Sequence, residues 1–194
     1  MSSISATWGT EPQERSRAFP CDGMISQPDA SLFRGITIDA APDIVFRWLC
    51  QMRAAPYSYD WIDNGGVPSP RQLTPGLDEL AVGQPVMRIF TLVSFKRDSH
   101  LTLRLKAKSS ASQTFGDIAV SYVILPPLEN GPRNRSRLLV KLIAKYPRSF
   151  RGRALRALLP WGDLIMMRRQ LLNLKQLAEH AQNPASESLP PSKD

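Results

Sequence analysis

Histidine, cysteine and the common catalytic motifs are scarce in this sequence of 194 residues. It contains two histidines, His100 and His180, and two cysteines, Cys21 and Cys50. A transition-metal site needs more ligands of this kind, and a disulfide framework needs more cysteines. The HExxH, GxSxG, GxxxxGK[ST] and CxxC motifs are also absent. We therefore expect no metal site and no cofactor, and we expect both histidines to be structural or exposed.

Long apolar runs are missing as well. No run approaches the roughly 20 residues that are needed to cross a bilayer. The N-terminal stretch MSSISATWGTEPQERSR has no apolar core behind basic residues, so we expect no secretory signal. With two cysteines and no disulfide framework, we expect a cytoplasmic protein.

Acidic residues are absent between Glu129 and Asp163, although the formal net charge of the whole chain is only +8. A basic surface on one side of a protein can attract phosphates, anionic lipid or an acidic partner. The alternative is a solvated strand face followed by a basic linker helix. The basic residues of this stretch are Arg133, Arg135, Arg137, Lys141, Lys145, Arg148, Arg151, Arg153 and Arg156.

Composition divides the chain into an arm, one domain and a tail. Residues 1–30 are rich in Ser, Pro, Gln and charge, which indicates a flexible or loosely packed arm. Residues 183–194 indicate a disordered tail by the same reasoning. The domain of 31–182 is long enough to bury a sizeable core.

The longest helical pattern covers residues 163–182. Apolar residues recur at alternating steps of three and four, which is the spacing of one helix face. A basic helical segment over 149–159 precedes it, and we expect Pro160-Trp161-Gly162 to separate the two. The residues of the stripe are Leu164, Met167, Leu171, Leu174, Ala178 and Ala181.

Earlier in the chain the period changes from helical to alternating. A strand over 33–39 is followed by helices over 42–52 and 57–64, and then by a Pro- and Gly-rich loop over 65–85. Strands are expected over 86–95, 101–107, 118–124 and 138–146, with a short one near 112–115 and a hairpin turn at 129–132. Consecutive strands with short links favour an antiparallel sheet. The expected fold is therefore α+β, with a curved antiparallel sheet wrapped around the long C-terminal helix.

Four pieces of the sequence resemble the START-related superfamily, also called SRPBCC, of polyketide cyclases, pollen allergens and lipid-transfer proteins. The resemblance is closest to small bacterial members of unassigned function. It implies a helix-grip fold with a cavity between the sheet and the C-terminal helix, but no particular reaction. The pieces are ITIDAAPDIVFRWLCQM at 36–52, YSYDWIDN at 57–64, LAVGQPV at 80–86 and MMRRQLLNLKQLAE at 166–179.

Aromatic side chains and a few polar groups on the expected inward faces suit a pocket for a flat or hydrophobic ligand, although they suit an ordinary core equally well. Asp60 could act as an acid or base or bind a ligand hydroxyl; with Asp63, it could instead cap the short helix. Arg88 could bind a carboxylate or phenolate if it points inward, and could equally point outward. The candidate ligand-binding residues are Trp48, Tyr57, Tyr59, Asp60, Trp61, Arg88, Phe90, Tyr122, Met166 and Met167.

Three functions agree with these patterns. The first is a protein that binds a small hydrophobic molecule, lipid-like or polyketide-like, in the cavity. The second is a cofactor-free enzyme of the aromatase or cyclase kind, in which Tyr57, Tyr59, Asp60 and Arg88 position the substrate and move protons. The third is a peripheral module that binds an anionic membrane through the basic segment 133–156. Nucleic acid is disfavoured because few aromatic residues interrupt that segment.

Overall fold

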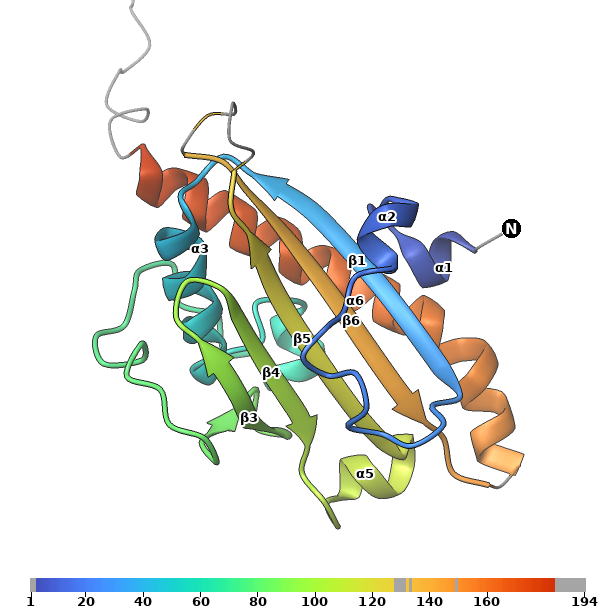
Figure 1. Ribbon diagram of the computed structural model, residues 1–194. Helices are drawn as coiled ribbons and strands as arrows, with labels where there is room; N and C mark the ends of the chain where they lie inside the picture. Colours follow the sequence, from blue (N-terminus) through green and yellow to red (C-terminus); the bar gives the residue numbers. More distant parts are fainter. Residues whose placement is uncertain (1–2, 128–131, 133, 149, 184–194) are drawn as a thin grey trace, which may run out of the picture.

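The computed structural model describes residues 3–127, 132, 134–148 and 150–183. Its centre is a six-stranded antiparallel sheet in the order β1-β6-β5-β4-β3-β2 (Figure 1). This sheet and a long C-terminal helix confirm the α+β, helix-grip fold expected from the sequence. The strands are β1 (Ala30–Ile38), β2 (Pro85–Val86), β3 (Phe90–Lys96), β4 (His100–Leu105), β5 (Asp117–Leu125) and β6 (Ser136–Lys145).

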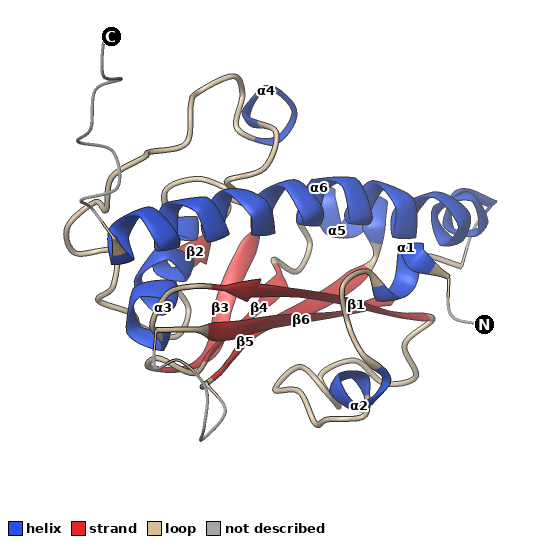
Figure 2. Cartoon of the chain, turned by 90° about the horizontal axis from the view of Figure 1, so that it is seen from above, coloured by secondary structure: helices blue, strands red, loops and turns tan. Residues whose placement is uncertain are grey.

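The helix α6 (Phe150–Gln182) crosses one face of the sheet, which we call the inner face (Figure 2). The expected apolar stripe forms its buried side except for its last member, Ala181, which is exposed. Successive members lie about one turn apart and point toward the strands. Strand residues on the same face, such as Leu103, Tyr122 and Leu138, are also buried and belong to the same core. The buried stripe residues are Leu164, Met167, Leu171, Leu174 and Ala178.

The expected break at Pro160-Trp161-Gly162 is wrong, because α6 continues through Pro160. A proline inside a helix removes one backbone hydrogen bond and crowds the preceding turn. Here Arg34 of β1 donates to the Pro160 carbonyl at 3.3 Å and to the Asp163 carboxylate at 2.7 Å. These contacts attach the helix to the sheet beside the position that proline weakens.

Smaller differences concern turns whose backbone geometry the sequence pattern did not reveal. The helix expected over 57–64 is only α4 (Asp60–Asp63), since Tyr57 has a left-handed backbone with a φ of 58°. The strand expected near 112–115 is instead helix α5 (Ser110–Phe115), which the Ser109 hydroxyl caps by accepting from the Ser112 N–H. The strand expected over 86–95 is divided into β2 and β3, because Met87 and Arg88 also have positive φ.

Two helical elements follow directly after β1 in the chain. Helix α3 (Pro42–Cys50) starts at a proline, which suits the first helical turn, and it continues into a 3₁₀ turn, η1 (Gln51–Arg53). Its buried side chains, including Val45, Phe46 and Leu49, close one end of the inner core.

The N-terminal segment differs from the flexible or loosely packed arm that its composition indicated. It contains the short helices α1 (Ile4–Thr7) and α2 (Pro12–Arg15) and then crosses the outer face of the sheet. Phe19, Cys21 and Ile25 are buried there against a second core of Ala119, Leu139 and Ile143. Gly9 allows close approach to β1, because a Cβ atom at this position would lie 2.1 Å from the Gly35 carbonyl oxygen.

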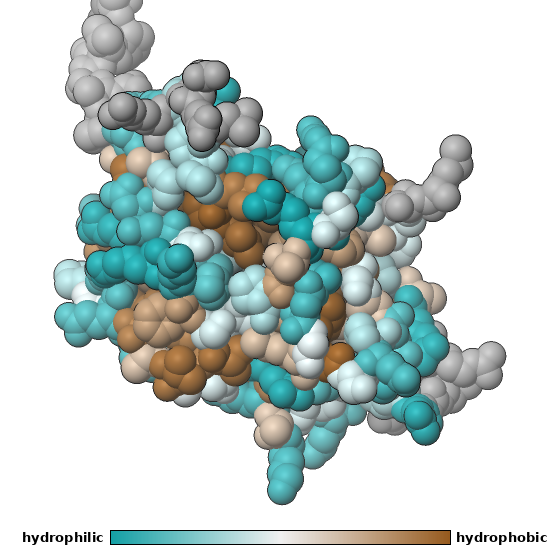
Figure 3. Space-filling view, viewed as in Figure 1, coloured by the Kyte–Doolittle hydropathy of each residue, from teal (hydrophilic) through white to brown (hydrophobic). Residues whose placement is uncertain are grey.

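Ion pairs join this arm to β6 and α6. Glu14 pairs with Arg137 at 2.8 Å, Asp22 pairs with Lys141, and Asp29 pairs with Arg156 at 2.9 Å. The basic stretch beginning at Arg133 is therefore partly neutralised by acidic residues of the arm. Hydrophilic and hydrophobic residues are mixed over the face where the arm lies (Figure 3).

Two expectations concern residues outside the described ranges. The tail 184–194 lies beyond them, as does the hairpin turn at 129–132 except for Pro132. Within the described residues, no helix is long and apolar enough to cross a membrane.

Candidate functional site

The inner face carries a buried ion pair beneath the first third of α6. The Arg34 side chain is only 1% exposed, and its Nη2 atom lies 2.7 Å from Asp163 Oδ2. The same guanidinium donates to the carbonyls of Phe33 and Ser5, both at 2.8 Å. Arg34 therefore joins β1, α1 and α6 at one point. A buried charge of this kind needs such partners, because its desolvation is costly.

Burial changes the acid–base behaviour of this region. Desolvation raises the pKa of the Asp163 carboxyl to about 6, although the adjacent Arg34 acts in the opposite direction. Desolvation also raises the pKa values of the Tyr122 and Tyr146 hydroxyls, and the negative charge of Asp163 adds to both shifts. Asp163 is therefore a buried carboxyl that can exchange a proton at mildly acidic pH.

A second set of polar side chains, which includes Gln170, lies about two turns beyond Asp163 along α6. The Tyr122 hydroxyl donates to Gln170 Oε1 at 2.8 Å, and Gln170 Nε2 donates to the Pro56 carbonyl at 2.6 Å. Asn173 donates to the Tyr57 carbonyl at 2.9 Å. These bonds connect the sheet and α6 to the segment that leads into α4. The buried interior is thus crossed by a row of polar groups.

Several buried polar atoms in the described part have no hydrogen-bond partner. On the inner side they are Tyr57 Oη, Trp48 Nε1, Tyr146 Oη and Arg34 Nε. The rings of Trp48 and Tyr57 lie edge to face, with centroids 6.2 Å apart. Burial raises the pKa of Tyr57 to about 12, so its hydroxyl is a neutral donor. Native proteins rarely leave such groups unsatisfied, because each costs about 1–3 kcal/mol.

The structure brings four of the candidate residues together in the interior. Trp48, Tyr57, Tyr122 and Met167 are buried in the inner core. Tyr122 also lies 3.7 Å from the Met167 sulfur, through its hydroxyl. Tyr59, Phe90 and Met166 are half-buried around this group.

Three other candidate residues have different surroundings. Trp61 is 76% exposed and Arg88 is also exposed, so neither lines the interior. Asp60 accepts hydrogen bonds from the backbone and hydroxyl of Ser69. Asp63 accepts from the Ser58 hydroxyl. Both carboxylates therefore stabilise local turns.

The pattern-based candidates omitted Arg34, Asp163, Tyr146 and Gln170. The sequence contained a signal for Arg34 and Asp163. Arg34 is the one charged residue within FRGITI, and Asp163 is the one acidic residue between Glu129 and Glu179. Asp163 also lies four residues before Met167, which places it beside the buried stripe. Gln170 and Tyr146 gave no comparable signal.

Hollows occur around the rim of the molecule. One of about 140 Å³ lies between α6 and the α4 segment and is lined by Tyr57, Ser58, Asp60, Arg169 and Asn173. Another of about 790 Å³ lies beside α5 and reaches Leu105 and Tyr146. Directly beneath the middle of α6, the space is filled by Tyr122, Leu171 and Leu174, which are at most 1% exposed.

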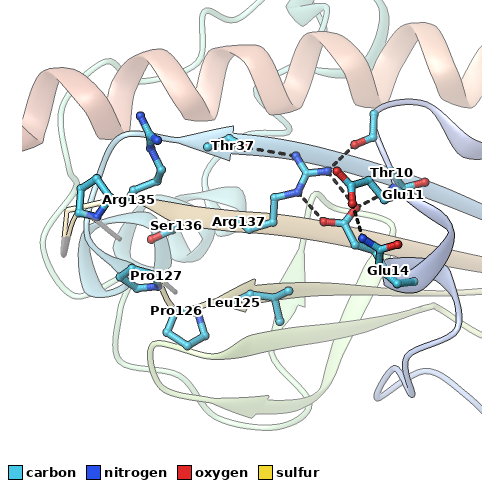
Figure 4. A pocket seen from close by; sticks show the side chains of 13 residues that line it. Thr10, Glu11, Glu14, Thr37, Leu125, Pro126, Pro127, Arg135, Ser136 and Arg137 are labelled. Carbon is cyan, nitrogen blue, oxygen red and sulfur yellow. Dashed lines mark hydrogen bonds and ion pairs between the residues drawn. The ribbon is translucent and has the colours of Figure 1, made fainter. Parts of the chain in front are cut away.

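A third hollow, of about 860 Å³, lies on the outer side of the sheet between the arm and the ends of β5 and β6 (Figure 4). The Arg137 guanidinium projects toward Glu14 and is bonded to both of its carboxylate oxygens (Figure 4). Arg135 is paired with Asp39 at 2.6 Å. These arginines already have acidic partners, so this hollow offers little free charge to an anionic ligand.

Metal-binding clusters are absent among the residues that the structure describes: no three His, Cys, Asp or Glu side chains gather there. Cys21 and Cys50 are buried and free, and burial raises both thiol pKa values, that of Cys50 to about 12. Burial also lowers the pKa of His100. At neutral pH the two thiols therefore stay protonated, and they suit neither metal binding nor nucleophilic attack.

No protein-family model matches the sequence, and no curated protein matches it. Solved structures with a similar chain path include a structural-genomics protein from Mesorhizobium loti, with a TM-score of 0.47, 14% identity, and coverage of 77% of this chain and 97% of that chain. The di-domain ARO/CYC protein BexL of the BE-7585A biosynthetic pathway has a TM-score of 0.49 and 13% identity, and the match covers 79% of this chain and 48% of that chain. The Zhui aromatase/cyclase from Streptomyces sp. R1128 has a TM-score of 0.43 and 10% identity, and the match covers 80% of this chain and 97% of that chain.

Aromatase/cyclase proteins are thus among these neighbours, and the sequence resemblance named the same kind of protein. Likeness at these identities and TM-scores carries no functional conclusion. The helix-grip assignment rests instead on the chain's own strand order and on the position of α6 across the inner face.

Proposed function

We propose that this protein binds a small, partly hydrophobic molecule between the inner face of the sheet and α6, close to Tyr57. The observation that carries the proposal is the Tyr57 hydroxyl, which is buried without a hydrogen-bond partner beside the equally unpartnered Trp48 Nε1. A bound molecule with one polar group would satisfy these donors. It would therefore recover free energy that the protein alone does not gain.

The chemistry of the surroundings limits the ligand. The inner core that contains Trp48, Tyr57 and Met52 is built from apolar and aromatic side chains. The hollow beside Tyr57 is lined largely by polar side chains, such as Ser58, Arg169 and Asn173. Both unpartnered atoms can donate a hydrogen bond at physiological pH, since Trp Nε1 only donates and the Tyr57 hydroxyl is protonated. We infer a lipid-like or polyketide-like molecule with an acceptor such as a carbonyl or ether oxygen.

Entry of such a molecule requires movement of the α4 segment. The hollow beside Tyr57, about 140 Å³, is smaller than the roughly 300–1,000 Å³ of typical ligand pockets. The segment is held to α6 by the Asn173 and Gln170 bonds to the Tyr57 and Pro56 carbonyls. The carboxylates of Asp60 and Asp63 bond within the segment itself. The segment can therefore shift as a unit when those two contacts to α6 open.

Fluorescence titration with 6-propionyl-2-(dimethylamino)naphthalene, an uncharged hydrophobic dye whose ketone oxygen accepts hydrogen bonds, tests the proposal. We expect saturable binding of one dye per chain. In Tyr57→Phe the dye should bind about five- to tenfold more weakly, because one hydrogen bond of roughly 1 kcal/mol is lost. The thermal midpoint should stay the same or rise, since the hydroxyl removed has no partner in the free protein.

Tyr59→Phe provides the matched control, because Tyr59 is close in the chain, only half-buried and packed against Arg169. It should leave the affinity unchanged. No saturable binding by the native protein, or equal affinity in native protein and Tyr57→Phe, would contradict the proposal.

A cofactor-free enzyme is the second candidate, and one observation favours it. Asp163 is a buried carboxyl whose pKa is raised to about 6 by desolvation, and such groups suit acid–base catalysis near neutral pH. Its proton would serve a substrate in the same interior, whereas the carboxylate of Asp60 is bonded to Ser69.

The two candidates differ in what they predict for Asp163→Asn. In a binding protein this variant should retain native affinity for the dye and for any hydrophobic molecule that co-purifies and is identified by native mass spectrometry. In an enzyme it should bind that molecule but abolish its slow conversion on incubation. A converted product in equal amount from both proteins would exclude Asp163 as the acid or base.

A further inference from the structure

The outward side of α6 carries an apolar stripe that nothing in the described chain covers. Leu158, Trp161 and Ile165 are 67%, 52% and 56% exposed, and Leu172 continues the row at 36%. Steps of three, four and seven residues place these side chains on one helix face. Stable monomers seldom expose so many large apolar side chains in one row.

This stripe lies opposite the side of α6 that packs on the sheet. Leu164, Met167 and Leu171 are buried beneath the helix, at positions about half a turn away from Leu158 and Ile165. Figure 2 shows α6 as an outer layer that runs across the strands, with its far side turned away from them. The stripe is therefore on a convex ridge and not in a groove.

Positive charge borders the stripe. Arg168 and Arg169 are exposed and lie three and four residues after Ile165 in the helix. Arg168 rests against the ring of Trp8, and Arg169 rests against the ring of Tyr59. In the sequence, residues 148–162 include no acidic residue and three arginines besides Arg156, which pairs with Asp29. Asp163, the next acidic residue, turns inward to Arg34 and does not neutralise this surface.

The rest of the basic stretch is engaged elsewhere. Arg137, Lys141 and Arg156 pair with acidic residues of the N-terminal arm, and Arg135 pairs with Asp39. A membrane contact along residues 133–156 would compete with these pairs. The outward side of α6 combines positive charge with exposed apolar side chains and does not require the pairs to break.

We propose that this side of α6 docks on the surface of an anionic lipid bilayer. An amphipathic helix lies in a membrane interface when its apolar side chains enter the headgroup boundary and its basic side chains meet anionic lipid. Tryptophan suits that boundary, because its ring is largely apolar and its N–H remains hydrated. A second copy of this chain is a poorer occupant, since a symmetric contact along α6 would bring like charges together.

The α4 segment supports the same orientation. Its Trp61 and Ile62 are exposed, and α4 lies on the side of α6 that faces away from the sheet (Figure 2). The proposal does not depend on the internal ligand, because it rests on a separate surface.

Sedimentation of the full chain with vesicles tests this surface. We expect binding to vesicles that contain phosphatidylglycerol, little binding to pure phosphatidylcholine, and weakening as salt is added. The double variant Trp161→Ser/Ile165→Ser should lower the partition coefficient at least tenfold, because each apolar side chain contributes free energy on burial. Both residues are exposed, so the thermal midpoint should remain close to native.

Val82→Ser is the matched control, because Val82 is 65% exposed but lies in the loop before β2, at the far edge of the sheet. The partition coefficient of this variant should equal that of the native protein. The proposal is overturned if the native protein binds neither kind of vesicle, if it binds both equally, or if the double variant binds as well as the native protein. A dimer in analytical ultracentrifugation that the double variant abolishes would also overturn it and assign the surface to a second copy.

Discussion

Asp163 and Arg34 show how single residues organise the interior of this protein. Arg34 donates to the backbone of α1, β1 and α6 as well as to Asp163. Removing one partner of a buried ion pair is more costly than replacing both, because the remaining charge loses its compensation. The pair fixes where α6 crosses β1, and it also places a titratable carboxyl close to Tyr122 and Tyr146.

The Asp163 carboxyl should make stability depend on pH in a defined direction. Its pKa is about 6 in the folded protein against an ordinary value of 3.8, so between these values the folded state binds more protons than the unfolded state. Stability from this group is complete below about pH 4 and is lost as the pH rises through 6. Asp163→Asn removes the effect, which amounts to about 3 kcal/mol at most.

Urea unfolding at several pH values measures this difference. The free energy of unfolding of the native protein should fall relative to that of Asp163→Asn between pH 4 and pH 7. Asp117→Asn, which removes a half-exposed partner of Arg104 and keeps Asp163, serves as the control. The free energy of unfolding of the native protein should not fall relative to that of this variant over the same pH range. Parallel curves for the native protein and Asp163→Asn would contradict the assignment.

Helices and strands show which features a sequence pattern can reveal. The stripe of α6 and the alternation in β4, β5 and β6 were predicted, because burial on one face imposes a period on the sequence. The continuity of α6 at Pro160 was not predicted, because it depends on Arg34, which is distant in the sequence. The helix α5 was missed for a similar reason: its Ser109 cap acts through a side-chain hydrogen bond and not through periodicity.

Pro160 should weaken α6 in a measurable way. Pro160→Ala restores a backbone donor and relieves crowding inside the helix, so we expect the free energy of unfolding to rise by about 1–3 kcal/mol. Pro126→Ala, in the loop after β5, should instead lower it slightly because the unfolded chain becomes more flexible. Equal or opposite shifts in urea unfolding would show that the helix is not continuous there.

The N-terminal arm should be released when its ion pairs are removed. Arg137→Ala deletes the bonds to Glu14 and to the Gly9 carbonyl, which hold the arm to β6. We expect the buried Cys21 thiol to react with 5,5′-dithiobis(2-nitrobenzoic acid) about tenfold faster, while Cys50 in α3 stays protected.

Arg135→Ala is the control for this prediction, because its half-exposed pair with Asp39 lies outside the arm. In this variant both thiols should still react slowly with the reagent. Equal acceleration of Cys21 and Cys50 in Arg137→Ala would indicate global unfolding and would contradict a local release of the arm.

The described molecule has three layers: the part of the N-terminal arm after α1, the sheet, and α6 with α1 beside it and α4 on its far side (Figures 1 and 2). The sequence predicted the sheet and α6, and four of its candidate residues, Trp48, Tyr57, Tyr122 and Met167, lie together in the interior. The arm's burial was missed, because charges on Glu14, Asp22 and Asp29 resemble a solvated segment until their partners on β6 and α6 are known. Arg34 and Asp163 were missed for the same reason, since an ion pair between distant residues leaves no period in the sequence.

The central claim is that the inner face of the sheet receives a ligand, and methyl NMR can test it directly. In a titration with 6-propionyl-2-(dimethylamino)naphthalene, the account predicts shifts for Met87, Met167 and Leu171, which belong to the inner core or pack against it. Leu139 and Ile143, buried on the outer face under the arm, should not move. Shifts confined to the outer-face methyl groups, or no shifts at a dye concentration that saturates the fluorescence signal, would contradict the claim.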